Sequence, residues 1–147
     1  MFKTRSLVTL LLTLPLVTSS MAAGITRFAS SSPDAPFSVA TQVGNTVYLS
    51  GQLPLDKQGK MADNMTAQAR QVMDNVKSAA AVAGLTMNDI FKCTVMIDDI
   101  SQWGDFNKVY VTYFEKGKLP ARSAFGADGL AMGAMLEVEC MGYKHME

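Results

Sequence analysis

Apolar residues in the middle of the chain recur every three or four positions, which is the period of an amphipathic helix. Asn64 or Thr66 can cap the first such segment, and Gly84 stands just beyond its end. A second segment follows Asp105, another candidate cap, and is closed by Gly117. The sequence therefore predicts two helices. The apolar stripe of the first comprises Ala69, Val72, Met73, Val76, Ala80 and Ala83, and that of the second comprises Phe106, Val109, Tyr110, Tyr113 and Phe114.

Alternation of apolar and polar residues predicts strands in the rest of the chain. The first two strands are joined by the turn signal Gly44-Asn45. Residues 23–36, rich in Ser, Pro and Ala, read as an extended lead-in. The order β-β-α-β-α-β-β predicts an α+β fold, a sheet with two helices packed on one face. The predicted strands are residues 37–43, 46–50, 90–97, 122–125 and 136–143.

The two longest strands have faces of different character. We expect the helices to cover the apolar face, which carries Phe91, Cys93, Val95, Leu136, Val138 and Cys140. The opposite face mixes charged and apolar side chains, namely Lys92, Thr94, Met96, Glu137, Glu139 and Met141. A mixed face of this kind is typical of a subunit interface, so the pattern indicates an oligomer.

The N-terminal segment has the pattern of a secretory signal. Lys3 and Arg5 precede an apolar run too short to span a bilayer comfortably, and small residues follow it. Pro15 and the small-residue exit favour a cleaved signal over a buried helix or a membrane anchor. We therefore expect residues 1–22 to be a signal peptide, with cleavage at Gly24 as a second possibility, and a periplasmic or secreted product.

The remaining residues 23–147 are enough for one domain. They carry eleven basic and thirteen acidic side chains, a net charge of −2, which argues against a nucleic-acid partner. No second long apolar run follows, so we expect no membrane association after cleavage. With a single histidine, His145, near the end of the chain, we expect no metal site. Cys93 and Cys140 fit either a disulfide or two buried thiols.

Two short motifs near the C-terminus carry candidate chemistry. In Pro120–Ser123, Arg122 offers the planar fork that suits a carboxylate. In Leu136–Glu139, Glu137 can order or deprotonate a water molecule. Taken alone, Arg122 fits a structural ion pair with Glu137 or Glu139 better than it fits a binding site.

These motifs resemble those of the RidA/YjgF family when they are taken, at their spacings, together with three others: Leu49–Pro54, Asn75-Val76, and Phe106-Asn107 with Tyr110. The resemblance runs from about Pro33 to Lys144. It implies a chorismate-mutase-like fold and a homotrimer with clefts between its subunits. It also implies hydrolysis of reactive 2-imino or enamine acids to 2-keto acids and ammonia, without metal or organic cofactor.

The resemblance also implies roles for individual residues. Arg122 matches the arginine that holds the substrate carboxylate, and Glu137 matches the acid that handles the hydrolytic water. The positions that match the lining of the substrate pocket are Ser50, Gly51 and Asn107.

Two substrate-binding positions depart from the family pattern. Phe37 stands where deaminases commonly have tyrosine, and Ala124 where they commonly have cysteine. These changes leave two alternatives with the same fold, a non-catalytic protein that binds small carboxylates and a stress chaperone.

Overall fold

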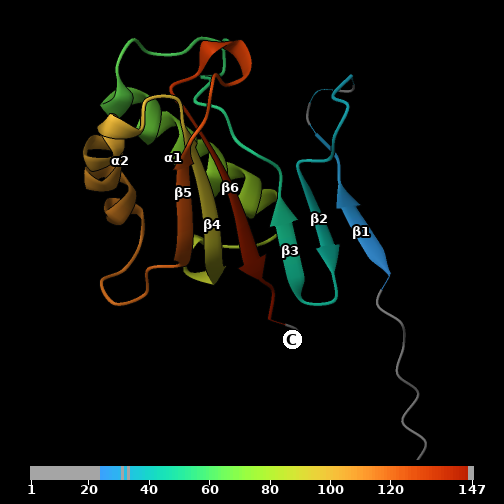
Figure 1. Ribbon diagram of the computed structural model, residues 1–147. Helices are drawn as coiled ribbons and strands as arrows, with labels where there is room; N and C mark the ends of the chain where they lie inside the picture. Colours follow the sequence, from blue (N-terminus) through green and yellow to red (C-terminus); the bar gives the residue numbers. More distant parts are fainter. Residues whose placement is uncertain (1–23, 31, 33, 146–147) are drawn as a thin grey trace, which may run out of the picture.

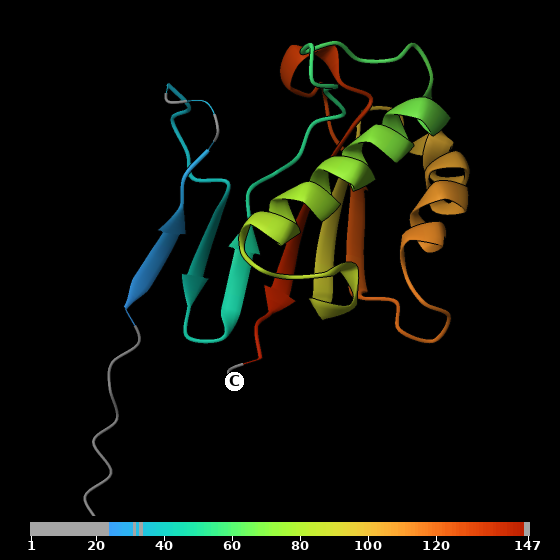
Figure 2. The same ribbon diagram turned by 180° about the vertical axis from the view of Figure 1, so that it is seen from behind.

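The computed structural model describes residues 24–30, 32 and 34–145, so the predicted signal peptide lies outside the described residues. The described chain forms one six-stranded sheet with both helices on the same side (Figures 1 and 2), which confirms the α+β prediction. The strands are β1 (Ile25–Phe28), β2 (Ala40–Val43), β3 (Thr46–Leu49), β4 (Ile90–Ile97), β5 (Ala121–Gly126) and β6 (Leu136–Tyr143). The helices are α1 (Met65–Val82) and α2 (Trp103–Tyr110), and the 3-10 turns are η1 (Met87–Asp89), η2 (Ile100–Gln102), η3 (Val111–Tyr113) and η4 (Ala131–Gly133).

The strands lie in the order β1-β2-β3-β6-β4-β5, and only β4 and β5 run parallel. Figure 2 shows α1 crossing the side of the sheet that holds β6, β4 and β5, whereas β1 and β2 extend beyond it. Helix α2 lies beside the β5 end of the sheet (Figure 1). Strand β1 falls within the predicted lead-in, where its four mostly exposed residues give no alternating pattern. No helix of the described residues is long and apolar enough to cross a membrane.

Helix α1 begins and ends where its sequence predicts. Asn64 caps it, because the side-chain oxygen accepts a hydrogen bond from the Ala67 amide at 2.9 Å. Gly84, at φ +77°, ends it in the left-handed conformation, and Lys144 Nζ donates to the Ala83 carbonyl at 2.9 Å. The side chains that α1 buries against the sheet are Met65, Gln68, Ala69, Val72, Met73, Val76, Ala79 and Ala80.

Helix α2 begins earlier than predicted, and Asp105 is not its cap. The capping carboxylate is that of Asp99, which accepts from the Ser101 amide at 3.0 Å and opens η2. Turn η2 runs directly into α2 at Trp103, which places Asp105 inside the first turn of the helix. The helix therefore presents Trp103 to the sheet edge, a residue outside the predicted stripe.

The two strand faces are as predicted, except at Phe91. A register shift between Ile90 and Lys92 turns Phe91 outward, where it is 44% exposed, and Ile90 takes the buried place. Such a bulge reverses the alternation at one point and cannot be read from apolar spacing alone.

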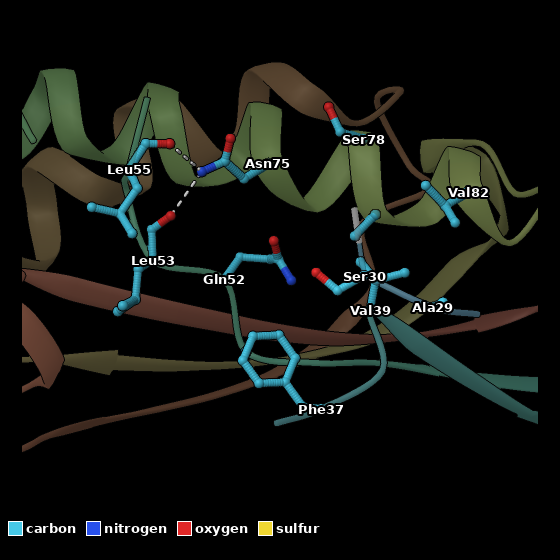
Figure 3. Close-up of a pocket in the computed structure, with 12 residues that line it drawn as sticks. Ala29, Ser30, Phe37, Val39, Gln52, Leu53, Leu55, Asn75, Ser78 and Val82 are labelled. Atoms are coloured by element: carbon cyan, nitrogen blue, oxygen red, sulfur yellow. Dashed lines mark hydrogen bonds between the residues drawn. The ribbon is translucent and has the colours of Figure 1, made fainter. Parts of the chain in front are cut away.

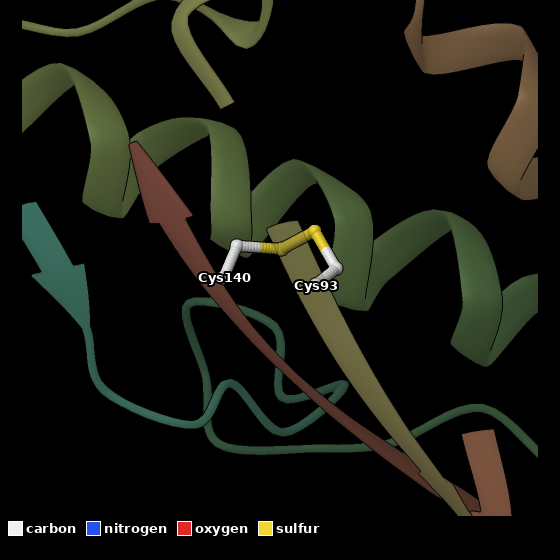
Figure 4. The surroundings of a disulfide bond; sticks show 2 residues. All are labelled: Cys93 and Cys140. Atoms are coloured by element: carbon white, nitrogen blue, oxygen red, sulfur yellow. A yellow bond between two sulfur atoms is a disulfide. The ribbon is translucent and has the colours of Figure 1, made fainter. Parts of the chain in front are cut away.

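The two cysteines form a disulfide, which settles the alternatives that the sequence left open. Cys93 on β4 lies directly opposite Cys140 on β6, with Cα atoms 4.1 Å apart. The bond lies on the helix-covered face of the sheet (Figure 4), and both residues are buried.

Candidate functional site

The predicted site residues fall into two clusters on opposite faces of the sheet. Arg122 on β5 is in register with Cys93 and points to the helix-covered face, whereas Glu137 on β6 is in register with Met96 and points to the open face. The Arg122 cluster contains Asn107, Arg122 and Ala124, to which the structure adds Trp103 and Tyr110. The Glu137 cluster contains Glu137 and Gly51, with Ser50 next to Gly51 in the chain, and Phe37 lies farther along, at a pocket that Gly51 shares with α1.

The Arg122 guanidinium lies between two aromatic rings of α2. Its Cζ is 4.4 Å from the ring centroid of Trp103 and 4.4 Å from that of Tyr110, and Phe106 lies behind at 5.7 Å. Nη1 is buried without a hydrogen-bond partner. Burial lowers the pKa of Arg122, because desolvation disfavours the charged form, but an arginine so placed remains a cation at neutral pH.

The structural ion pair that sequence reasoning left open does not form. Glu137 and Glu139 project from the opposite face of the sheet from Arg122. Within the described residues, the ion pairs are Lys108 with Asp105 and Lys118 with Glu115, all on the surface. Arg122 is thus a partly buried cation that has no acidic partner in this part of the chain.

Two further polar atoms of α2 are buried without a partner among the described residues: Oη of Tyr110, whose ring contacts Arg122, and Oδ1 of Asn107, one turn earlier in the helix. Tyr110 is only 2% exposed, and this burial raises its pKa to about 12, so the phenol is neutral at physiological pH. Buried polar groups in proteins nearly always have partners. Unpartnered groups gathered around a free cation are what a binding site for a small polar molecule requires.

Glu137 lies against Gly51, which explains the need for glycine at that position. A Cβ built on Gly51 would overlap Glu137 Oε1, so any side chain there would displace the carboxylate. The backbone fixes this approach, because Gln52 and Val138 exchange both backbone hydrogen bonds, at 2.8 and 3.1 Å. The segment around Gly51 therefore lies alongside β6 at the point where the glutamate projects.

Ser50 links the Glu137 cluster to the loop that carries Phe37. Its hydroxyl donates to the Ser38 carbonyl at 2.7 Å. Phe37 is 57% exposed and lines a pocket of about 390 Å³ between this loop and α1, into which Gln52 and Ser30 also point (Figure 3). This pocket adjoins Gly51 and is separate from the Arg122 cluster.

Asn75 on α1 supports the same segment from behind. Its Nδ2 donates to the carbonyls of Leu53 and Leu55 at 2.8 and 2.9 Å, as Figure 3 shows, and its Oδ1 accepts from Gln71 at 2.9 Å. These bonds use the whole amide, so Asn75 holds the strand segment and is not free for a ligand.

Sequence reasoning missed Trp103, and it placed Tyr110 in the apolar stripe and among the motif residues without a role at the site. The available signal was their spacing, since residues 103, 107 and 110 lie three or four positions apart and share one side of a helix. The described residues contain no group of three or more His, Cys, Asp or Glu side chains that could hold a metal ion.

Residues 28–144 match the family described as endoribonuclease L-PSP. The 2-iminobutanoate/2-iminopropanoate deaminase of Mus musculus is 36% identical over 108 residues, which cover 72% of this chain and 79% of that protein. A RutC family protein of Pyrococcus horikoshii is 36% identical over 114 residues, covering 76% of this chain and 90% of that one.

Solved structures agree with these sequence relatives. A putative endoribonuclease L-PSP from Entamoeba histolytica is 36% identical, with a TM-score of 0.75 over 82% of this chain and 99% of that chain. The YjgF gene product of Escherichia coli is 31% identical, with a TM-score of 0.73 over 86% of this chain and 100% of that chain. With both the sequence match and the fold in agreement over nearly all of the described residues, the chain belongs to the endoribonuclease L-PSP family, which includes the RidA/YjgF proteins.

Proposed function

We propose that this protein hydrolyses 2-imino or enamine acids to 2-keto acids and ammonia. The observation that carries the proposal is Arg122, a partly buried cation without an acidic partner among the described residues. A guanidinium in this state suits a small carboxylate, which it can bind through two parallel hydrogen bonds. The relatives named 2-iminobutanoate/2-iminopropanoate deaminase support an imino acid as that carboxylate.

The catalytic site of this proposal is shared between two copies of the chain. Arg122 and Glu137 project from opposite faces of one sheet, so a single copy cannot offer both to one small molecule. Two copies can, if the open face of one sheet packs against the α2 side of the next. This arrangement agrees with the homotrimer and inter-subunit clefts that the sequence resemblance implies.

The chemical step follows from the two side chains. Arg122 fixes the carboxylate, and backbone groups near Gly51 and Ala124 orient the nitrogen. Glu137 takes a proton from water as the water oxygen attacks the imine carbon, and it returns this proton to the nitrogen, which gives a carbinolamine. Glu137 then takes the proton of the new hydroxyl group and passes it to the nitrogen. The C–N bond breaks with its electron pair on the nitrogen, which releases ammonia and leaves the 2-keto acid. Imines also hydrolyse without a catalyst, so positioning and one general base supply enough acceleration.

Phe37 favours a second candidate function, the binding of a small carboxylate without turnover. Deaminases commonly place a tyrosine there, and the phenylalanine removes a polar contact from the pocket beside Gly51. Ala124 is the milder change, because it lies next to Arg122 on the same face of β5 and leaves backbone groups available.

We also infer that the protein works in an oxidising compartment. The buried Cys93–Cys140 disulfide supports this inference, since such bonds persist mainly in secreted and periplasmic proteins. The signal-like residues 1–22 agree with it.

The test of the deaminase proposal uses an imino acid generated in solution by an amino-acid oxidase. Its decay is followed with wild-type protein, with Arg122→Ala and with Arg27→Ala, in which an exposed arginine on β1 is removed as a matched control. We expect the wild type and the control to speed the decay and Arg122→Ala to have no effect. Wild-type decay at the uncatalysed rate, or full activity in Arg122→Ala, would refute the proposal. Saturable binding of 2-keto acids without turnover would favour the second candidate.

A further inference from the structure

We propose that Trp103 and Tyr110 form an aromatic clamp that holds the Arg122 guanidinium in place of a counter-ion and keeps its outer edge free for the substrate carboxylate. Both are positioning residues, since they act on the substrate through Arg122. The inference rests on the proposed function only in assuming that the ligand of Arg122 is a carboxylate.

The geometry of the clamp is symmetrical. The guanidinium carbon is 4.4 Å from each of the two ring centroids, well inside the range of about 6 Å in which a cation over a ring is attracted. Trp103 and Tyr110 are seven residues apart on α2, so they lie on the same side of the helix two turns apart. The side chain of Arg122 enters between them from β5.

The rings of Trp103 and Tyr110 stabilise the buried guanidinium without blocking it, as a carboxylate partner would. A buried cation is costly unless something compensates the loss of water, and the usual partner is an acid. An acid would occupy the same edge of the guanidinium that a substrate carboxylate needs. Aromatic faces stabilise the charge from above and below and leave the in-plane N–H groups unused, in keeping with the unpartnered Nη1.

The clamp is rigid because α2 is anchored beneath it. Phe106, between the two clamp residues, is fully buried and its ring centroid lies 6.3 Å from Trp103 and 5.4 Å from Tyr110. Arg122 itself is fixed by the parallel pairing of β5 with β4. The orientation of the guanidinium is therefore set before a ligand arrives, which reduces the entropy lost on binding.

The clamp makes a sharp prediction about which part of Trp103 matters. Trp103→Leu removes the aromatic face, whereas Trp103→Phe keeps one. We expect 2-oxobutanoate, the keto-acid probe, to bind Trp103→Leu about five- to thirtyfold more weakly than wild type, and Trp103→Phe within about threefold of it. In turnover, KM rises by the same factor in Trp103→Leu while kcat changes little, because the lost contact holds the bound substrate throughout the reaction.

Binding to the Trp103 variants is measured by calorimetry. Since Trp103 is the only tryptophan of the chain, its emission reports the clamp directly in wild type and in Tyr110→Phe. We expect 2-oxobutanoate to change this emission, and Tyr110→Phe, which keeps the ring, to bind it within about threefold of wild type. Thermal unfolding of each variant shows whether the fold is retained.

Several results would overturn the clamp. They are wild-type affinity in a folded Trp103→Leu, no rescue in Trp103→Phe, or no binding of 2-oxobutanoate by the wild type. These outcomes differ from a failure of the proposed function. If 2-oxobutanoate binding depends on the clamp as expected but no imine is hydrolysed, only the deaminase proposal is refuted. If turnover requires Arg122 but is unchanged in Trp103→Leu, only the clamp is refuted.

Discussion

Removal of the Cys93–Cys140 disulfide should lower the free energy of unfolding by an amount that depends on the number of residues between the two cysteines. The cysteines are 47 residues apart. A cross-link closing a loop of that length removes about 14 cal/mol/K of entropy from the unfolded chain, which corresponds to about 4 kcal/mol at 25 °C. Residual structure in the unfolded chain reduces the effect, so we expect a loss of about 2–4 kcal/mol in the free energy of unfolding.

The assay is urea unfolding of the oxidised protein, of the same protein under reducing conditions, and of the double variant Cys93→Ala/Cys140→Ala. All are measured at one protein concentration, because unfolding of an oligomer depends on it. The reduced wild type keeps both sulfur atoms in the core and so isolates the cross-link from the cavity that alanine leaves. The unfolding slope should rise on reduction, since the unlinked chain exposes more surface. Equal midpoints for oxidised and reduced protein would show that the cross-link contributes nothing.

Three other perturbations test the site and its surroundings. Glu137→Gln should lower kcat by about a hundredfold or more, whereas Glu139→Gln, two residues along the same face, should keep near wild-type turnover; equal effects would contradict the assigned roles. Gly51→Ala should lower kcat by about a hundredfold, because the added Cβ displaces the Glu137 carboxylate, and should change the thermal midpoint little. A variant that fails to fold would contradict this prediction. Burial raises the pKa of Tyr110 and Tyr113 to about 12, against about 10 in an unfolded chain. Between pH 10 and 12 the folded state therefore keeps protons that the unfolded state loses. The free energy of unfolding, measured in urea, should fall as the pH rises over this range, and a value independent of pH would refute the prediction.

Local signals in the sequence predicted most of the fold. Helix α1 has a strong period, a capping asparagine and a terminal glycine, and these determine its ends without help from the rest of the chain. The strands β4 and β6 alternate over eight residues each, so their faces were predictable. The exceptions are places where a distant contact overrides the local pattern. The bulge at Ile90 reverses one face, and β1 exists because it pairs with β2.

The candidate site was predictable as a set of residues but not as a geometry. Arg122 and Glu137 were identified by resemblance to a family, and their separation depends on the register of three strands that no local pattern specifies. The aromatic surroundings of Arg122 depend on where α2 begins. The sequence predicted a start at Asp105, and the earlier start at Trp103 brings the tryptophan onto the side that faces β5.

The opposite orientation of Arg122 and Glu137 leads to a test of where catalysis takes place. If each cleft takes its arginine from one copy and its glutamate from another, Arg122→Ala and Glu137→Gln are each inactive alone but can complement one another. If the protein is the proposed homotrimer, an equal mixture of the two variants is unfolded and refolded together. About one quarter of its clefts then combine an intact arginine with an intact glutamate, so activity should return to about a quarter of wild type. The control is a mixture of the two folded variants that is not unfolded, so that no subunits exchange. This mixture should show no activity. A refolded mixture without activity would mean that both residues act within one copy, and the shared-site proposal would be wrong.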